Sequence, residues 1–413
     1  MIRTIQTQTF LTSLAAYGAS EVAAKASRLL VVVAVARTLD VAVIGVAAAA
    51  LAAGDILKAL TENGIGQRII AARTDTLEAV CITARRLFWM WCAGLFVAQL
   101  ALAGALYGIG ADPLLAALIA LMGLEYLFMP AGLVQVALAM RAGQLKQTAA
   151  LGGAQVVGAN LISIVLLVLW PSAIALVIPR VLSAPIWLIA VRRLHPWTPG
   201  ATAGAPLAPF LRYGWAVLGV EVVKVLRLQA DKLIVGVTLG AEALGLYFMA
   251  FNAGLSLSNA FANAFSTVLF PQLARATDKA QSARSGLVLG LCCITPLVLM
   301  QAALVPVYVP MLLGDGWAGI EVYVQILCLL AIPTTLWAAA ASWLRHHDRP
   351  HVEFAITSGL AAAVVLNALM LGPIGLTALV VGYATLSALL MTATALWVLR
   401  RILLPTTNKW VTP

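Results

Sequence analysis

The sequence predicts an all-α polytopic membrane protein, with about twelve transmembrane helices in two parallel six-helix lobes around a central cavity. Three observations support this fold class. The 413-residue chain is 62% hydrophobic and only 10% charged, its mean hydropathy is +0.98, and its apolar runs are separated by short connections. A soluble domain is about a quarter charged and about half apolar. No segment here is therefore polar enough to form a large soluble domain.

The apolar runs set the number of helices. A helix needs ~20 mostly apolar residues to span a bilayer. Twelve runs meet this requirement: 10–36, 41–66, 80–107, 113–139, 147–169, 171–191, 208–229, 241–266, 285–309, 320–344, 352–371 and 375–399.

The Lys and Arg residues between these runs predict the orientation. One side of the membrane would carry 18 of them, and the other side only Arg37 and Lys232. Because cytoplasmic loops are enriched in Lys and Arg, both termini are predicted to be cytoplasmic. The net charge of +10 then reflects these loops, and no nucleic-acid partner is expected. The 18 residues are Arg3, Arg68, Arg73, Arg85, Arg86, Arg141, Lys146, Arg192, Arg193, Arg212, Arg275, Lys279, Arg284, Arg345, Arg349, Arg400, Arg401 and Lys409.

The two halves of the chain repeat each other at an offset of 200 residues. TLDVAVIGVAAAALAAG (38–54) aligns with TLGAEALGLYFMAFNAG (238–254), and Gly45 matches Gly245. Six helices separate the repeats, so the halves are parallel. This predicts an N-terminal six-helix lobe (1–191), a cytoplasmic linker (192–207) and a C-terminal six-helix lobe (208–413). Parallel lobes usually enclose a substrate path and work by alternating access.

Eleven charged residues within the predicted helices are candidate site residues, and at a lipid-exposed centre each would cost ~2.5–3.5 kcal/mol. They must therefore face protein or water. Within each of the first, second and seventh helices the charges recur at helical spacing, so they lie on one face. The cations are Lys25, Arg28, Lys58, Arg180, Lys224 and Arg227, and the acids are Glu21, Asp55, Glu62, Glu125 and Glu221.

Two interpretations of these charges stay open. In the first, the cations line a hydrated path and bind an anionic substrate, because guanidinium forks match phosphate and carboxylate groups. The acids would then be candidate ion-coupling sites. In the second, the charges form ion pairs within one helix, such as Asp55 with Lys58, and only fix packing. Arg227 could equally extend to the outer interface.

The sequence offers no sign of an enzyme. No nucleotide-binding motif, catalytic pair of nucleophile and base, or metal-ligand spacing stands out, so no catalytic residue, metal or cofactor is expected. Two Gly-x-x-x-Gly pairs, at 104 and 108 and at 286 and 290, are typical of close helix packing.

Two stretches resemble bacterial polysaccharide transporters. Residues 30–70, from LVVVAVARTLD to NGIGQRII, resemble the family's first two helices. Residues 211–254 are similar to its central signature, in which the seventh helix continues through an aqueous ADKLIVG segment into the eighth. That signature ends at a Phe-Pro, here within VLFPQLARA (268–276).

This family belongs to the multidrug/oligosaccharidyl-lipid/polysaccharide exporter superfamily. The resemblance implies a flippase that moves undecaprenyl-pyrophosphate-linked oligosaccharide from the cytoplasmic to the periplasmic leaflet of the bacterial inner membrane. The product would enter O-antigen, capsule or exopolysaccharide synthesis. Membrane lipids are expected partners, and a polysaccharide polymerase and its chain-length machinery are candidate ones. Related lipid-precursor flippases use cations in a central cavity, and Lys25, Arg28 and Lys224 occupy comparable helices.

A second function is kept as an alternative. A cation-coupled multidrug or metabolite antiporter of the same superfamily would favour acidic and aromatic residues in its cavity. The surplus of cations on the first and seventh helices argues against an antiporter.

Overall fold

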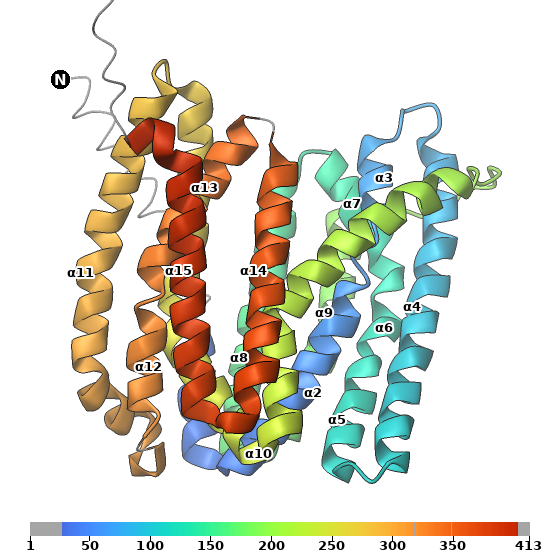
Figure 1. The fold of residues 1–413 in the computed structure, drawn as a ribbon. Coiled ribbons are helices and arrows are strands. Elements are labelled where there is room, and N and C mark those ends of the chain that lie inside the picture. The colour runs from blue at the N-terminus through green and yellow to red at the C-terminus, as the bar shows by residue number, and fades with distance from the viewer. Residues whose placement is uncertain (1–26, 318, 348, 404–413) are drawn as a thin grey trace, which may run out of the picture. The chain divides into compact units, whose positions relative to one another are not determined.

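The chain folds into long helices connected by short turns (Figure 1). The computed structural model describes residues 27–317, 319–347 and 349–403. No strand occurs in these ranges. Residues 27–38 are helical. The further helices are α2 (Val41–Ala59), α3 (Ile65–Ala71), α4 (Leu77–Gly108), α5 (Pro113–Gly123), α6 (Glu125–Phe128), α7 (Pro130–Arg141), α8 (Leu145–Leu169), α9 (Ile174–Leu194), α10 (Ala208–Arg275), α11 (Lys279–Leu313), α12 (Glu321–Cys328), α13 (Ala331–His346), α14 (Pro350–Leu371) and α15 (Leu376–Leu403).

Nine helical stretches of the described chain are long and apolar enough to cross a membrane, or ten if the bent α5–α7 segment is one span. The predicted class of all-α polytopic membrane protein is therefore confirmed. Two differences explain why the described chain has fewer candidate spans than the twelve helices that the sequence predicts. The first predicted run, 10–36, begins outside the described residues, and the runs 208–229 and 241–266 are joined within α10.

The junction inside α10 lies at Gly240. This residue has φ +85° and ψ 178°, a conformation that only glycine adopts readily. The sequence predicts that the helix ends at 229, followed by an aqueous segment. That boundary is wrong, because the helix continues to the residue before Gly240.

The repeat at an offset of 200 residues has a direct structural counterpart. A Cβ atom added at Gly45 of α2 would lie 1.7 Å from the carbonyl oxygen of Ala241. One added at Gly245 of α10 would lie 2.2 Å from the carbonyl oxygen of Val41. Residues 41 and 241, and 45 and 245, are equivalent in the repeat. The two helices therefore cross backbone to backbone at the matched glycines, and neither glycine leaves room for a side chain.

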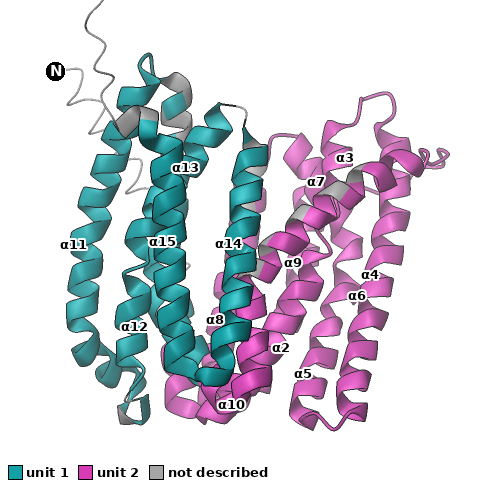
Figure 2. Ribbon diagram, in the orientation of Figure 1, with its two compact units in different colours: residues 1–32, 246–413 teal, residues 33–245 magenta. Residues whose placement is uncertain are grey.

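The chain forms two compact units, coloured separately in Figure 2. One comprises residues 33–245. The other comprises residues 246–413 together with the segment before residue 33. The predicted lobes 1–191 and 208–413 concern the pseudo-symmetry of the helices, and that division stays a prediction.

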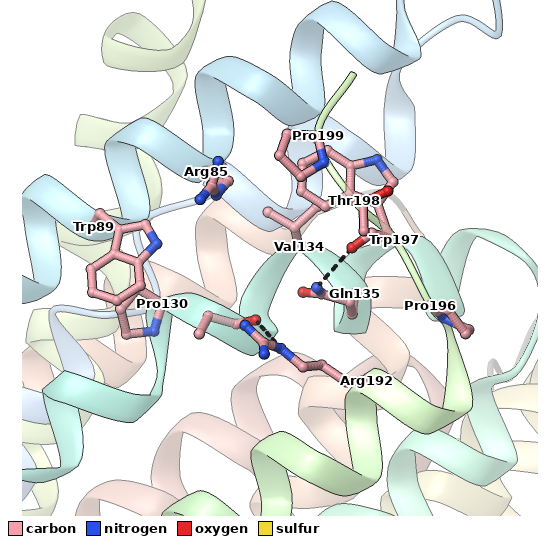
Figure 3. Close-up of a pocket in the computed structure, with 11 residues that line it drawn as sticks. Arg85, Trp89, Pro130, Val134, Gln135, Arg192, Pro196, Trp197, Thr198 and Pro199 are labelled. Atoms are coloured by element: carbon pink, nitrogen blue, oxygen red, sulfur yellow. Dashed lines mark hydrogen bonds between the residues drawn. The ribbon is translucent and has the colours of Figure 1, made fainter. Parts of the chain in front are cut away.

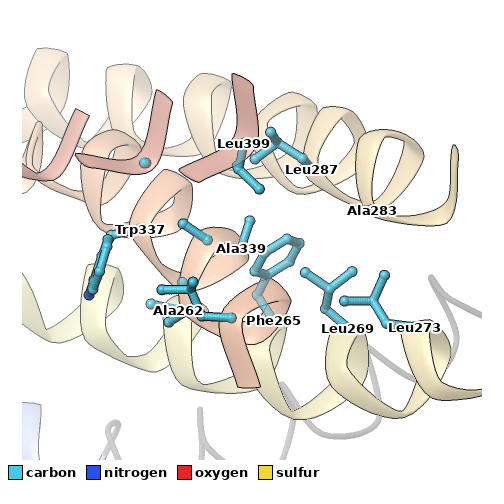
Figure 4. Close-up of a cluster of buried hydrophobic side chains, with 14 of the residues drawn as sticks. Ala262, Phe265, Leu269, Leu273, Ala283, Leu287, Trp337, Ala339 and Leu399 are labelled. Carbon is cyan, nitrogen blue, oxygen red and sulfur yellow. The ribbon is translucent and has the colours of Figure 1, made fainter. Parts of the chain in front are cut away.

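The unit containing the C-terminal helices has a core built by the end of α10 with α11, α13, α14 and α15 (Figure 4). Phe265 and Leu269 of α10 are fully buried there. Added Cβ atoms at Gly290 and Gly286 of α11 would lie 2.5 Å and 2.7 Å from these two side chains. Gly286-x-x-x-Gly290 therefore receives two large side chains, as close packing between membrane helices requires.

The other Gly-x-x-x-Gly pair behaves differently. Added Cβ atoms at Gly104 and Gly108 of α4 would meet no heavy atom within 4 Å in the described part of the chain. The prediction that this pair mediates helix packing is therefore wrong within these residues.

The crossing at Gly45 predicts a large difference between two Gly→Ala substitutions. Gly45→Ala puts a methyl group into a backbone carbonyl that cannot move aside, so it should destabilise the protein by about 1–3 kcal/mol. Gly245→Ala should act alike. Gly104→Ala adds the same methyl group in open space and should be neutral or slightly stabilising, because Ala is the better helix former.

The measurement is the apparent melting temperature of each purified variant in one detergent. Equal melting temperatures for Gly45→Ala and Gly104→Ala would contradict the tight crossing.

Candidate functional site

Asp55, near the end of α2, has a partner on each of its carboxylate oxygens. Arg180 Nη1 of α9 lies 2.7 Å from Asp55 Oδ1. Gln229 Nε2 of α10 donates to Asp55 Oδ2 at 3.0 Å. A carboxylate inside a membrane needs such partners, because hydrocarbon cannot replace its hydration. One residue thus joins three helices.

Lys58 lies one turn after Asp55, on the same face of α2. Its ammonium group forms an ion pair with Glu125 at the start of α6. The Glu125 side chain is only 7% exposed, whereas that of Lys58 is 39% exposed. An ammonium group carries three donors. Lys58 can therefore hold the covered carboxylate and still donate to a second anion.

Both partners of α2 lie in interrupted helices. The α5–α6 segment and α7 meet at a bend of 55°, and α7 starts with Pro130. Pro179 precedes Arg180 inside α9 and has no N–H to donate to the preceding turn. Broken helices are common where transporters place their binding sites.

We call Asp55, Lys58, Glu125, Arg180 and Gln229 the α2 charge cluster. It holds two acids and two bases, so its formal charge is zero. All five residues lie within the unit 33–245. An uncompensated charge inside a protein costs several kcal/mol. Interhelical pairing therefore explains how α2 can carry two charges within an apolar run.

The cluster bears on the two sequence interpretations. Among the described residues, Lys58 forms no ion pair with Asp55 or Glu62. Lys58 instead pairs with Glu125, and Glu62 is exposed. Glu125 and Arg180, each the only charge in its predicted helix, become the partners of α2. Whether these groups also bind substrate or couple ions stays a prediction.

Of the other predicted site residues, the structure describes the side chains of Arg28 and Glu221. Arg28 lies in the helix 27–38 with an exposed side chain, and Glu221 is half-buried in α10. Four further predicted site residues lie outside the part that the structure describes. These are Glu21 and Lys25, together with the side chains of Lys224 and Arg227.

Lys232 does not lie in an aqueous outer connection, as the sequence led us to expect. Asp231 and Lys232 are both buried within α10. Lys232 Nζ donates to the carbonyl oxygen of Leu228 and lies 3.5 Å from Asp231 Oδ1. The neighbouring carboxylate and the preceding helical turn thus satisfy the ammonium group, and the helix does not need to end here.

Gln229 is the cluster residue that the sequence analysis missed. It is uncharged, and the search considered only charged residues inside apolar runs. A weak signal exists, because Gln229 is an amide at the end of such a run, two residues before Asp231.

The fold defines a class of protein: a multi-pass α-helical membrane protein with the fold of the MOP transporter superfamily. The lipid II flippase MurJ, in an inward closed conformation, superposes with a TM-score of 0.75 and 11% identity, over 92% of this chain and 86% of that one. An inward-facing multidrug resistance MATE transporter gives 0.64 and 13%, over 95% and 94%. A transporter from Pyrococcus furiosus, described as having a binding pocket of reverse polarity, gives 0.60 and 12%, over 94% and 95%. At these identities the likeness shows the fold alone.

Sequence comparison then assigns the family. The family of polysaccharide biosynthesis proteins matches residues 34–322, well over half of the chain, and the chain belongs to this family. The resemblance seen in the sequence is thereby confirmed. The lipopolysaccharide biosynthesis protein WzxC of Escherichia coli (strain K12) is 25% identical over 182 residues. This match spans 42% of the chain and only 37% of that relative's length.

The Lys58–Glu125 pair predicts non-additive substitutions. Lys58→Met or Glu125→Gln alone should destabilise the protein by roughly 1–3 kcal/mol. This is below the ~3–5 kcal/mol of a fully buried pair, because Lys58 is partly exposed. The double variant should cost less than the sum of the two, because neither partner is left unpaired.

Thermal unfolding of the four proteins of this cycle in detergent measures the coupling. Glu62→Gln, an exposed carboxylate after the same helix, is the matched control and should change little. Strictly additive effects of Lys58→Met and Glu125→Gln would show that the pair does not form.

Proposed function

We propose that this protein is a flippase that translocates undecaprenyl-pyrophosphate-linked oligosaccharide from the cytoplasmic to the periplasmic leaflet by alternating access. The observation that supports this most strongly is the family match over residues 34–322. The fold likeness to a lipid II flippase and the sequence likeness to a lipopolysaccharide biosynthesis protein agree with it. The product would enter O-antigen, capsule or exopolysaccharide synthesis.

The chemistry of the cargo gives the α2 charge cluster a role. A pyrophosphate loses much of its hydration on entering a membrane protein and needs charge-assisted donors in return. Lys58 and Arg180 are partly exposed, at 39% and 31% of their side chains, and both retain donors beyond those used within the cluster. The lipid tail can stay in the bilayer, so only the head group has to be neutralised. Lys25, Arg28, Lys224 and Arg227 are proposed as further ligands.

The acids of the cluster supply a way to couple transport to ions. In this structure Glu125 neutralises Lys58. A pyrophosphate approaching Lys58 would replace this carboxylate as its counter-ion and leave Glu125 available to bind the coupling ion. Cargo binding and ion binding at Glu125 are thereby linked. Asp55, Glu21, Glu62 and Glu221 are the other candidate coupling sites.

The alternative is a cation-coupled multidrug or metabolite antiporter. The support for this alternative is the similarity of the fold to that of a MATE transporter. In that mechanism Asp55 and Glu125 would bind the coupling or transported cation directly. Lys58 and Arg180 would then only set the affinity of these carboxylates, and replacing them would not abolish transport.

Charge substitutions separate these functions. Lys58→Glu and Arg180→Glu should reduce flipping by roughly tenfold or more, the loss expected when one charge-assisted hydrogen bond is replaced by repulsion. Arg28→Glu and Lys25→Glu should act alike, whereas Arg28→Lys keeps the charge and should reduce transport only in part. The measurement is the amount of lipid-linked oligosaccharide that accumulates on the cytoplasmic leaflet, normalised to the variant's abundance in the membrane.

Arg73→Glu is the matched control, because Arg73 is exposed and pairs only with its neighbour Asp75 among the described residues. It should flip at the parental rate. If the cluster variants reach normal abundance and also translocate lipid-linked oligosaccharide at that rate, the cluster only supports packing and is not the binding site of the cargo.

We also propose an inner-membrane location with both termini in the cytoplasm. The support is the distribution of loop Lys and Arg. Reporter fusions test it: those after Arg73, Lys146, Gly200, Lys279 and Arg349 should report the cytoplasm, and those after Asp112, Trp170 and Gly314 the periplasm. A periplasmic signal at Gly200 would contradict the parallel lobes.

A further inference from the structure

A second polar site lies away from the α2 charge cluster, in the same unit. It is a cavity of about 350 Å³ whose walls come from α4, α7, α9 and the segment after α9 (Figure 3). This size is at the lower end of the range for small-molecule sites. The lining residues are Arg85, Trp89, Pro130, Ala131, Val134, Gln135, Arg192, Pro196, Trp197, Thr198 and Pro199.

The lining carries two positive charges and no acid. Arg85 makes no hydrogen bond or ion pair within the described part of the chain. Arg192 uses only Nε, which donates to the carbonyl oxygen of Ala131 at 3.3 Å. Figure 3 shows these two arginines on opposite sides of the cavity. Both guanidinium groups therefore keep donors for an anion, and the planar fork of arginine suits phosphate.

One wall of the cavity is held in place by a specific set of hydrogen bonds. Glu78, at the start of α4, accepts from Trp197 Nε1 at 3.2 Å and from the backbone N–H of Gly200 at 2.9 Å. Farther along, Ala205 N donates to the carbonyl oxygen of Ala79 at 3.0 Å. The segment 195–207 is thus a strap fastened to α4, and the Glu78 carboxylate is engaged in fastening it.

The position of the cavity relates it to the membrane surface. Arg85 and Arg192 belong to the side of the molecule predicted to be cytoplasmic. Trp89 is 44% exposed and Trp197 half-buried. Tryptophan concentrates at the level of lipid head groups, and basic pockets between membrane helices on the cytoplasmic side bind anionic head groups.

We propose that this cavity binds the phosphate group of an anionic phospholipid from the surrounding leaflet. Arg85 and Arg192 hold the phosphate, and Trp89 and Pro130 cover the glycerol and the start of the acyl chains. Glu78 positions the strap that closes the site. This role is separate from transport of the cargo at the α2 charge cluster.

The test uses native mass spectrometry of the purified full-length protein with phosphatidylglycerol or phosphatidylcholine of the same acyl chains. The wild type should retain phosphatidylglycerol in preference to phosphatidylcholine. Arg85→Gln/Arg192→Gln should weaken this binding by at least roughly tenfold, the value of one lost charge-assisted contact. Arg86→Gln/Arg193→Gln removes the same charge from adjacent residues outside the cavity and should bind like the wild type.

Three results would overturn the proposal. The first is a wild type without preference for the anionic lipid. The second is equal loss in both double variants, which would indicate diffuse attraction to the surface. The third is displacement of the lipid by an equal concentration of soluble glycerol phosphate, which would identify a soluble anion as the ligand. Arg85→Lys/Arg192→Lys guards against misfolding, because it keeps both charges and should bind with intermediate affinity.

Discussion

The cost of holding charge inside a membrane governs how α2 packs against its neighbours. Helix α2 is apolar enough to span a bilayer and yet carries Asp55 and Lys58. Their partners come from α9, α6 and α10, so the charges also specify how four segments meet. A packing element built from polar groups can exchange its partners, whereas one built from leucines cannot. This property makes the cluster suitable for binding an anion in one state and releasing it in another.

The crossing of α2 and α10 supplies the rigid counterpart of the cluster. At Gly45 and Gly245 two backbones touch without intervening side chains. Asp55 follows Gly45 in α2, and its partner Gln229 belongs to the part of α10 before Gly240, whereas Gly245 belongs to the part after it. The contact of α2 at the matched glycines is thus steric, and its contact through Asp55 and Gln229 is polar and exchangeable. A conformational change that rearranges the cluster must either keep the glycine crossing as a fixed pivot or pull the two backbones apart at that point.

Composition and loop charge were enough to predict the fold class and nearly all helices, because apolar length and the distribution of Lys and Arg are properties of local sequence. The same local reasoning failed at Lys232, since a buried lysine satisfied by Asp231 and a backbone carbonyl resembles a loop residue in sequence. It named Asp55, Lys58, Glu125 and Arg180 individually but paired them wrongly, because pairing depends on which helices are neighbours. Gln229 carried only a weak signal, as an amide at the end of an apolar run, and the cavity arginines Arg85 and Arg192 carried none that distinguished them from the other loop cations.

In the proposed mechanism, Lys58 exchanges Glu125 for the pyrophosphate of the cargo. Infrared difference spectroscopy of the protein with and without a short-chain prenyl pyrophosphate measures this directly. We expect the carboxylate band of Glu125 to shift on ligand addition, because its ion pair with Lys58 is broken. This shift should occur in the wild type and in Glu62→Gln and be absent in Glu125→Gln. If the ligand binds in the same sample and no band that depends on Glu125 changes, the exchange does not take place.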